Sequence, residues 1–137
     1  MQREYRRNFD EIRRIVADTG KFFDQENIDP GLRLKVDLSI EELFVNMVTY
    51  DTETNRDILI GMESIENGIE VSLTDFDVHP FDPTQPRDVD IDAPLSERNP
   101  GGLGLFLVLK MVDSIHYEHR DGNSTITFRI CGGNNDA

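Results

Sequence analysis

The sequence predicts an α+β fold in which helices cover one face of a mixed, mostly antiparallel sheet. Two amphipathic helical patterns open the chain, and two pairs of β-rich segments, each joined by a short turn, predict hairpins. The length of 137 residues, of which 37% are hydrophobic, allows one core but not two full domains. We expect the domain to span residues 1–131 and residues 132–137 to form a disordered tail.

Apolar residues recur every three to four positions in the two N-terminal segments, which is typical of amphipathic helices. The first helix is expected from Asn8, as its cap, to about Phe23. The second is expected to begin at Asp29-Pro30, a cap followed by a first-turn proline, and to end near Tyr50. The expected core positions are Phe9, Ile12, Ile15, Val16, Phe22 and Phe23 in the first helix, and Leu32, Val36, Ile40, Leu43 and Met47 in the second.

The middle of the chain predicts a hairpin followed by a long loop. Residues 56–64 and 69–74 are β-rich and flank Glu66-Asn67-Gly68, whose last two residues favour the positive φ angles of a tight turn. Residues 79–104 contain five of the six prolines and little apolar periodicity. Because such a loop is too long for an idle connection in a compact domain, we interpret it as a lid or a binding loop.

The C-terminal part predicts one further helix and a closing hairpin. Residues 103–112 are apolar nearly all round, which indicates a buried helix. Residues 114–120 and 124–130 flank Asp121-Gly122-Asn123 as the two strands of the hairpin.

Charge and composition exclude several classes of function. The formal net charge is -13, and residues 36–100 alone carry 16 acidic and 3 basic side chains. Such a chain repels nucleic acid. Cys131 is the only cysteine, so an intrachain disulfide cannot form. No apolar run approaches the roughly 18 residues of a membrane span, and the N-terminus lacks the apolar stretch of a signal peptide. We therefore expect a cytoplasmic protein without a membrane partner.

Glu42 and Asn46 form the first candidate functional pair. They lie one turn apart on the second helix, so their side chains share a face. A carboxylate can take a proton from a hydroxyl group, and an amide oxygen can hold Mg²⁺. Two structural alternatives are a capping box formed by Ser39 and Glu42 and a solvated helix face.

Asp75, at the end of a β-rich segment, is the second candidate. A carboxylate there can accept a hydrogen bond from an exocyclic amine such as that of adenine. One alternative is a turn favoured by its Asp and Pro neighbours. Another is a divalent metal site, because Asp75, Asp77 and His79 would share one face of an extended strand.

The third candidate is Gly101-Gly102-Leu103-Gly104, directly before the apolar helix. Glycines let backbone N–H groups approach a phosphate, and a helix N-terminus favours its negative charge. A hinge is the structural alternative.

In this order and spacing, the three features resemble the Bergerat-type nucleotide fold of the GHKL superfamily, that is, the histidine kinase-like ATPases. Glu42-Leu43-Phe44-Val45-Asn46 resembles the N-box, Asp75 with Phe81-Asp82-Pro83 the adenine-binding box, and residues 97–104 the end of the lid with the second glycine box. Within the superfamily the sequence is most similar to the small anti-sigma factor serine/threonine kinases. The resemblance covers roughly residues 8–130.

The resemblance implies a kinase that binds ATP with Mg²⁺ and phosphorylates an anti-sigma factor antagonist of the STAS type. It implies Glu42 as catalytic base, Asn46 as Mg²⁺ ligand and Asp75 as the residue that reads adenine. Asp77 would also contact the nucleotide, and the phosphates would lie against Gly101, Gly102, Leu103 and Gly104. A sigma factor would compete for the kinase, and a homodimer is compatible with the resemblance.

Two departures from the family pattern bear on function. Asp77 stands where the family usually has glycine, and only residues 1–7 are available for an edge strand before the first helix. Asp77 favours a second hypothesis, a module that binds a sigma factor or antagonist without turnover. A third hypothesis is a metal-dependent hydrolase that uses Asp75, Asp77 and His79.

Overall fold

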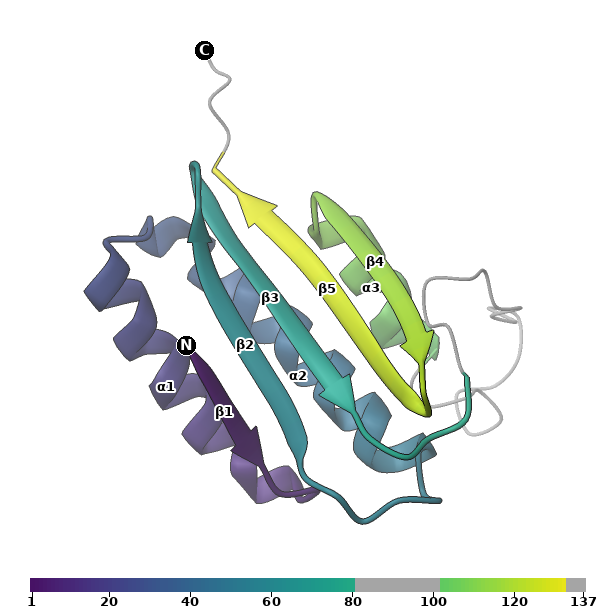
Figure 1. The fold of residues 1–137 in the computed structure, drawn as a ribbon. Coiled ribbons are helices and arrows are strands. Elements are labelled where there is room, and N and C mark those ends of the chain that lie inside the picture. Colours follow the sequence, from purple (N-terminus) through teal and green to yellow (C-terminus); the bar gives the residue numbers. More distant parts are fainter. Residues whose placement is uncertain (81–101, 133–137) are drawn as a thin grey trace.

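The computed structural model describes residues 1–80 and 102–132. Its strands and helices are arranged as two layers (Figure 1). In chain order the elements are β1 (Gln2–Tyr5), η1 (Phe9–Glu11), α1 (Ile12–Glu26), η2 (Pro30–Leu32), α2 (Arg33–Tyr50), β2 (Ile58–Ile65), β3 (Gly68–Asp75), α3 (Gly102–Met111), β4 (Ser114–Arg120) and β5 (Asn123–Cys131), where η marks a 3-10 turn.

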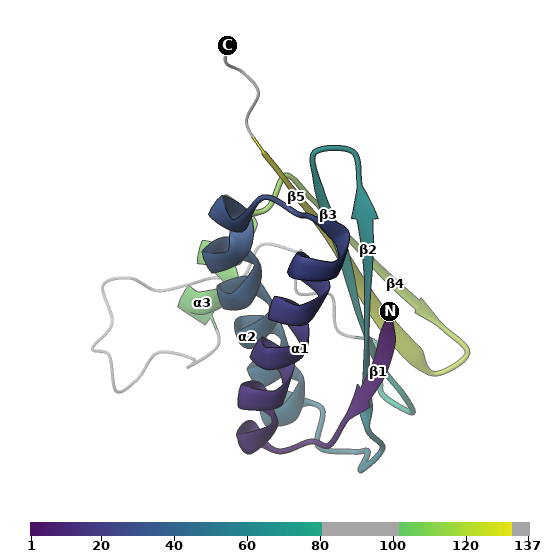
Figure 2. The same ribbon diagram turned by 90° about the vertical axis from the view of Figure 1, so that its left-hand side faces the viewer.

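The five strands form one sheet in the order β1-β2-β3-β5-β4. Every pairing between them is antiparallel. The three α-helices lie on one face of this sheet, as the side view shows (Figure 2). The predicted α+β sandwich is thereby confirmed, and the described strands contain no parallel pair.

The core lies between the sheet and the helices because side chains alternate along the central strands. Ile60, Val71 and Phe128 are buried on the helix-covered face. Their neighbours Gly61, Ser72 and Thr127 lie in register with one another on the opposite face, which is mostly polar. This alternation fits a sheet with one buried and one solvated face.

Both N-terminal helices form, but the expected core differs at Val16, which is only half-buried, and at Phe9, which is exposed. Asn8 accepts a hydrogen bond from the Asp10 N–H group at 2.8 Å, so it caps the turn that leads into α1. The helix continues to Glu26, three residues beyond the predicted end. Phe9, expected in the core, is 53% exposed, because it belongs to the 3-10 turn rather than to the apolar face of α1.

The prediction for α2 is confirmed in detail. Asp29 accepts a hydrogen bond from the Gly31 N–H group at 2.9 Å and caps the turn before the helix. The whole predicted stripe is buried: Leu32, Val36, Ile40, Leu43 and Met47.

Both predicted hairpins are confirmed by their turns. Asn67 has a φ of 62°, and Asp121 and Gly122 have φ values of 55° and 82°, as tight turns between antiparallel strands require. The short edge strand expected within residues 1–7 is also present, as β1, and it pairs with β2.

The C-terminal helix differs from the expectation of a helix buried all round. Leu105 and Val108 are buried, whereas Phe106, Leu107 and Leu109 are at least 36% exposed. Only one face of α3 therefore contributes to the core. The expected loop over 79–104 and the tail over 132–137 fall mostly outside the described residues. Among the described helices, none is long and apolar enough to cross a membrane.

Candidate functional site

Glu42 lies where α2 meets the first turn of α3. Its carboxylate packs so closely against Gly104 that a Cβ atom at position 104 would overlap both carboxylate oxygens. The glycine therefore permits the contact between the two helices, which pack side by side. The expected base and one glycine of the expected phosphate cradle are thus brought together.

The environment of Glu42 makes its carboxylate more basic. The side chain is half-buried, and desolvation together with the negative charge of Glu41 raises the pKa of Glu42 above its usual value. A raised pKa suits a group that must take up a proton during a reaction. The capping-box alternative is wrong, because Ser39 lies inside α2 rather than at its start.

Asn46 lies one turn further along α2 and is only 5% exposed. Its Oδ1 atom is buried and has no hydrogen-bond partner among the described residues. The alternative of a solvated helix face is therefore wrong. Because an unpaired buried amide oxygen is costly, this atom is suited to a bound ligand or ion. An amide oxygen is also a ligand type that Mg²⁺ accepts, so the residue fits the expected metal role.

Asp75 ends β3 and is fully buried. Both of its carboxylate oxygens accept hydrogen bonds from the Arg7 guanidinium, with Nη2 and Oδ2 3.1 Å apart. Arg7 is itself only 10% exposed, so this is a buried ion pair. The turn alternative for Asp75 is wrong, because the residue belongs to the strand.

Asp51, directly after α2, also hydrogen-bonds with Asp75. Burial, followed by this hydrogen bond and the charge of Asp75, raises the pKa of Asp51 to about 8. At neutral pH Asp51 therefore carries a proton, which it donates to the Asp75 carboxylate.

Asp77 leaves the extended backbone conformation of β3. Its φ of 59° lies in the left-handed region, which glycine adopts freely and Asp tolerates. Its carboxylate is exposed and pairs with Arg56 at 3.2 Å, while the Arg56 guanidinium stacks on Phe76. Part of the negative charge of Asp77 is therefore balanced by Arg56.

The alternative metal site at Asp75, Asp77 and His79 is wrong. The positive φ at Asp77 breaks the extended strand that would have aligned the three side chains. Asp75 faces Arg7, and Asp77 faces Arg56. Within residues 1–80 and 102–132, no three His, Cys, Asp or Glu side chains are grouped to hold a metal ion.

The glycine cluster is described only in part. Gly102, Leu103 and Gly104 form the first residues of α3, so the cluster opens a helix as expected. Gly101 lies outside the described residues, as do Phe81, Asp82 and Pro83.

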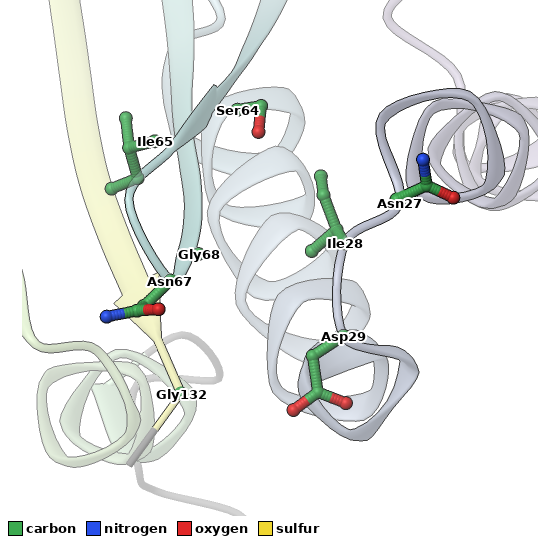
Figure 3. A pocket seen from close by; sticks show the side chains of 8 residues that line it. All are labelled: Asn27, Ile28, Asp29, Ser64, Ile65, Asn67, Gly68 and Gly132. Atoms are coloured by element: carbon green, nitrogen blue, oxygen red, sulfur yellow. The ribbon is translucent and has the colours of Figure 1, made fainter. Parts of the chain in front are cut away.

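A pocket of about 370 Å³ lies between the α1–α2 connection and the β2–β3 hairpin (Figure 3). Its lining includes Asn27, Asp29 and Gly68, from the α1–α2 connection and the β2–β3 hairpin. Gly68 and Asp75 are the two ends of β3, so the pocket is about 20 Å from Asp75. It is therefore separate from the candidate site.

Sequence reasoning missed Arg7 and Asp51. Arg7 is separated from Asp75 by 68 positions, and Asp51 follows a helix end with no motif of its own. The sequence offered only the general rule that a buried carboxylate needs a cationic partner. This rule does not identify which arginine pairs with Asp75.

Comparisons with known proteins identify the family and the fold. The family model described as histidine kinase-like ATPase domain matches residues 5–130. No curated protein is significantly similar in sequence.

Two solved structures have a similar fold. The RsbU and RsbW domains of Rv1364c from Mycobacterium tuberculosis superpose with a TM-score of 0.67 at 13% identity, over 96% of this chain and 31% of that one. The Acinetobacter baumannii histidine kinase AdeS gives a TM-score of 0.51 at 17% identity, over 98% of this chain and 68% of that one. This chain thus spans about a third of the length of the solved Mycobacterium chain.

Proposed function

Because the chain belongs to the histidine kinase-like ATPase domain family, we propose that it binds ATP with Mg²⁺ between α2 and the N-terminus of α3 and phosphorylates a protein serine or threonine. The observation that carries the proposal is the contact between Glu42 and Gly104, one turn from the unpaired Asn46 oxygen. Three elements that the reaction needs are thereby adjacent: a base, a metal ligand and a helix N-terminus that favours phosphate.

The roles of the side chains follow from their chemistry. Bound Mg²⁺, held through the Asn46 oxygen, would neutralise phosphate charge. Glu42 takes the proton of the substrate hydroxyl group while the hydroxyl oxygen forms a bond to the γ-phosphorus. The bond between that phosphorus and the bridging oxygen breaks, and ADP leaves. Backbone N–H groups at the start of α3, from Gly102 to Gly104, favour the phosphate charge.

The proposed substrate is an anti-sigma factor antagonist of the STAS type, with a sigma factor as the competing partner in the cytoplasm. The N-box and glycine-box resemblance supports this choice. The similarity in fold to a structure that contains an RsbW domain is in line with it. A switch of this kind needs the kinase to bind two proteins in turn.

The test is transfer of labelled γ-phosphate from ATP to candidate antagonist domains. Glu42→Gln keeps the size of the side chain but removes the base, so we expect transfer to fall by at least about 100-fold. Glu26→Gln is the control, because Glu26 is an exposed carboxylate at the end of α1, outside the candidate site. Equal transfer by Glu42→Gln and the wild type would exclude Glu42 as the base.

A second candidate is a binding module without turnover, and Asp77 favours it. Its carboxylate adds negative charge where the family usually has glycine. This candidate predicts partner binding without nucleotide. Titration with millimolar ATP and Mg²⁺ separates the two candidates, since only the kinase should bind the nucleotide.

A further inference from the structure

Arg7 connects the N-terminal segment to the end of β3. Besides its two contacts with the Asp75 carboxylate, its Nη2 atom lies 2.8 Å from the Met47 carbonyl oxygen and 3.1 Å from the Asp51 carbonyl oxygen. Its Nη1 atom lies 3.2 Å from the Arg56 carbonyl oxygen. The guanidinium is thus fixed by the end of α2, the following loop and β3 together.

We propose that Arg7 is a positioning residue for base selection: it contacts both oxygens of Asp75 and fixes the carboxylate as a hydrogen-bond acceptor in one orientation, so that the site prefers a base with an exocyclic amine over one with a keto oxygen. This inference rests on the proposed function, because it takes the Asp75 carboxylate as the group that meets the base. It adds a residue that has no place in the sequence motifs.

Asp75 is fully buried, and a buried carboxylate needs a partner that compensates its charge. Arg7 supplies a permanent positive charge in contact with both oxygens of Asp75. Both oxygens therefore face N–H donors, which is the arrangement that an amine from a bound base would extend. A keto oxygen has no proton to donate to such a carboxylate.

The orientation of Asp75 follows from its hydrogen-bond positions. An ionised carboxylate offers about four acceptor positions. Arg7 occupies two of them, and Asp51 occupies a third through its side-chain hydrogen bond. These contacts leave at most about one acceptor position, which the proposal assigns to the amine of a bound base. A keto oxygen at that place would face an acceptor, which costs binding energy.

The experiment compares the affinities of the full chain for ATP and inosine triphosphate, both with Mg²⁺. Inosine triphosphate carries a keto oxygen in place of the amine and a proton on N1, with identical sugar and phosphates. The test variant is Arg7→Gln. Arg3→Gln is the matched control, since Arg3 also comes from the N-terminal segment and also binds both oxygens of a buried carboxylate, that of Asp18.

We expect the preference for ATP to fall at least about tenfold in Arg7→Gln, because Asp75 loses the two contacts that orient it toward the amine. The preference should stay at the wild-type value in Arg3→Gln. An unchanged preference in Arg7→Gln would overturn the inference. Tighter ATP binding by Arg7→Gln would also overturn it, because Arg7 would then block the base.

Arg7→Lys keeps the inference testable if Arg7→Gln does not fold. Lysine keeps the positive charge but loses the planar fork, so the preference for ATP should remain while affinity for both nucleotides falls several-fold. A lost preference, or unchanged affinity, would contradict the proposal. Failure of the wild type to bind ATP at all would overturn the proposed function and this inference with it. Binding by the wild type with a negative result for the variants would overturn the inference alone.

Discussion

At the scale of single residues, the polar groups of the candidate site differ in how far the chain itself satisfies them. The buried Asn46 oxygen has no partner among the described residues, whereas Asp75 is bound by Arg7 and Asp51. Under the proposed function, a ligand would complete the surroundings of Asn46, but it would have to share Asp75 with Arg7 and Asp51. The proposed Mg²⁺ ligand Asn46 and the proposed adenine-binding residue Asp75 thus depend on different contacts.

The substitution Gly104→Ala tests whether activity depends on the contact between Glu42 and the start of α3. In Gly104→Ala the new methyl group pushes away the Glu42 carboxylate, which is the end of a flexible side chain. We therefore expect little loss of stability, but at least about tenfold slower phosphate transfer, because the base is displaced. Gly132→Ala is the control, since nothing lies within 3.5 Å of its added Cβ atom. Rapid transfer by Gly104→Ala would contradict the proposed position of the base.

Asp51 should make stability depend on pH. The folded protein keeps the Asp51 proton up to about pH 8, whereas the unfolded chain releases it near the usual pKa of 3.8. The free energy of unfolding should therefore fall between these two values, by at most about 1.4 kcal/mol per pH unit from this group. Because Asp51 is only half-buried, the slope should be smaller than that limit.

Asp51→Asn removes this proton and keeps a hydrogen-bond donor for Asp75. Denaturant unfolding between pH 5 and pH 8 should therefore give a flatter curve for the variant than for the wild type. Parallel curves would show that the pKa of Asp51 is not raised in the folded protein.

At the scale of elements, β1 is a short strand that depends on side-chain contacts with α1. The buried Tyr5 hydroxyl group donates a hydrogen bond to the Asp18 carboxylate at 2.7 Å. Tyr5→Phe should lower the free energy of unfolding by about 1.5–3 kcal/mol, because Asp18 loses a buried donor. Arg3→Gln, which removes a half-exposed partner of the same carboxylate, should cost less than about 1 kcal/mol. Equal losses in denaturant unfolding would contradict this ranking.

Elements that are determined by local sequence patterns could be predicted from the sequence. The stripe of α2 and the turns at Asn67 and Gly122 follow from spacing and backbone preference alone. The exposure of Phe9 and of one face of α3 could not be predicted, because it depends on where each helix packs in three dimensions.

The same distinction applies to the candidate site. Glu42, Asn46 and Gly104 belong to motifs that can be recognised in the sequence, and the structure brings Glu42 and Gly104 into contact. The ion pair between Arg7 and Asp75 joins segments that no local pattern relates. The roles of the site residues stay predictions until they are tested.

At the scale of the whole molecule, the distribution of charge limits how a nucleotide can bind. The net charge of -13 is concentrated in residues 36–100. This segment includes the proposed catalytic base Glu42 and Asp75, the carboxylate proposed to bind adenine. The phosphates of ATP are themselves strongly negative. A site in this segment therefore needs a divalent cation between protein and phosphates, together with the N-terminus of α3.

The measurement that tests the central claim most directly is calorimetric titration of the full chain with ATP, with Mg²⁺ and with excess chelator. Our account predicts binding with Mg²⁺ and none that can be detected with the chelator at millimolar ATP. Asn46→Ala should lose most of the binding that depends on Mg²⁺, because it removes the proposed metal ligand. Equal affinity with and without Mg²⁺, or no binding in either condition, would contradict the account.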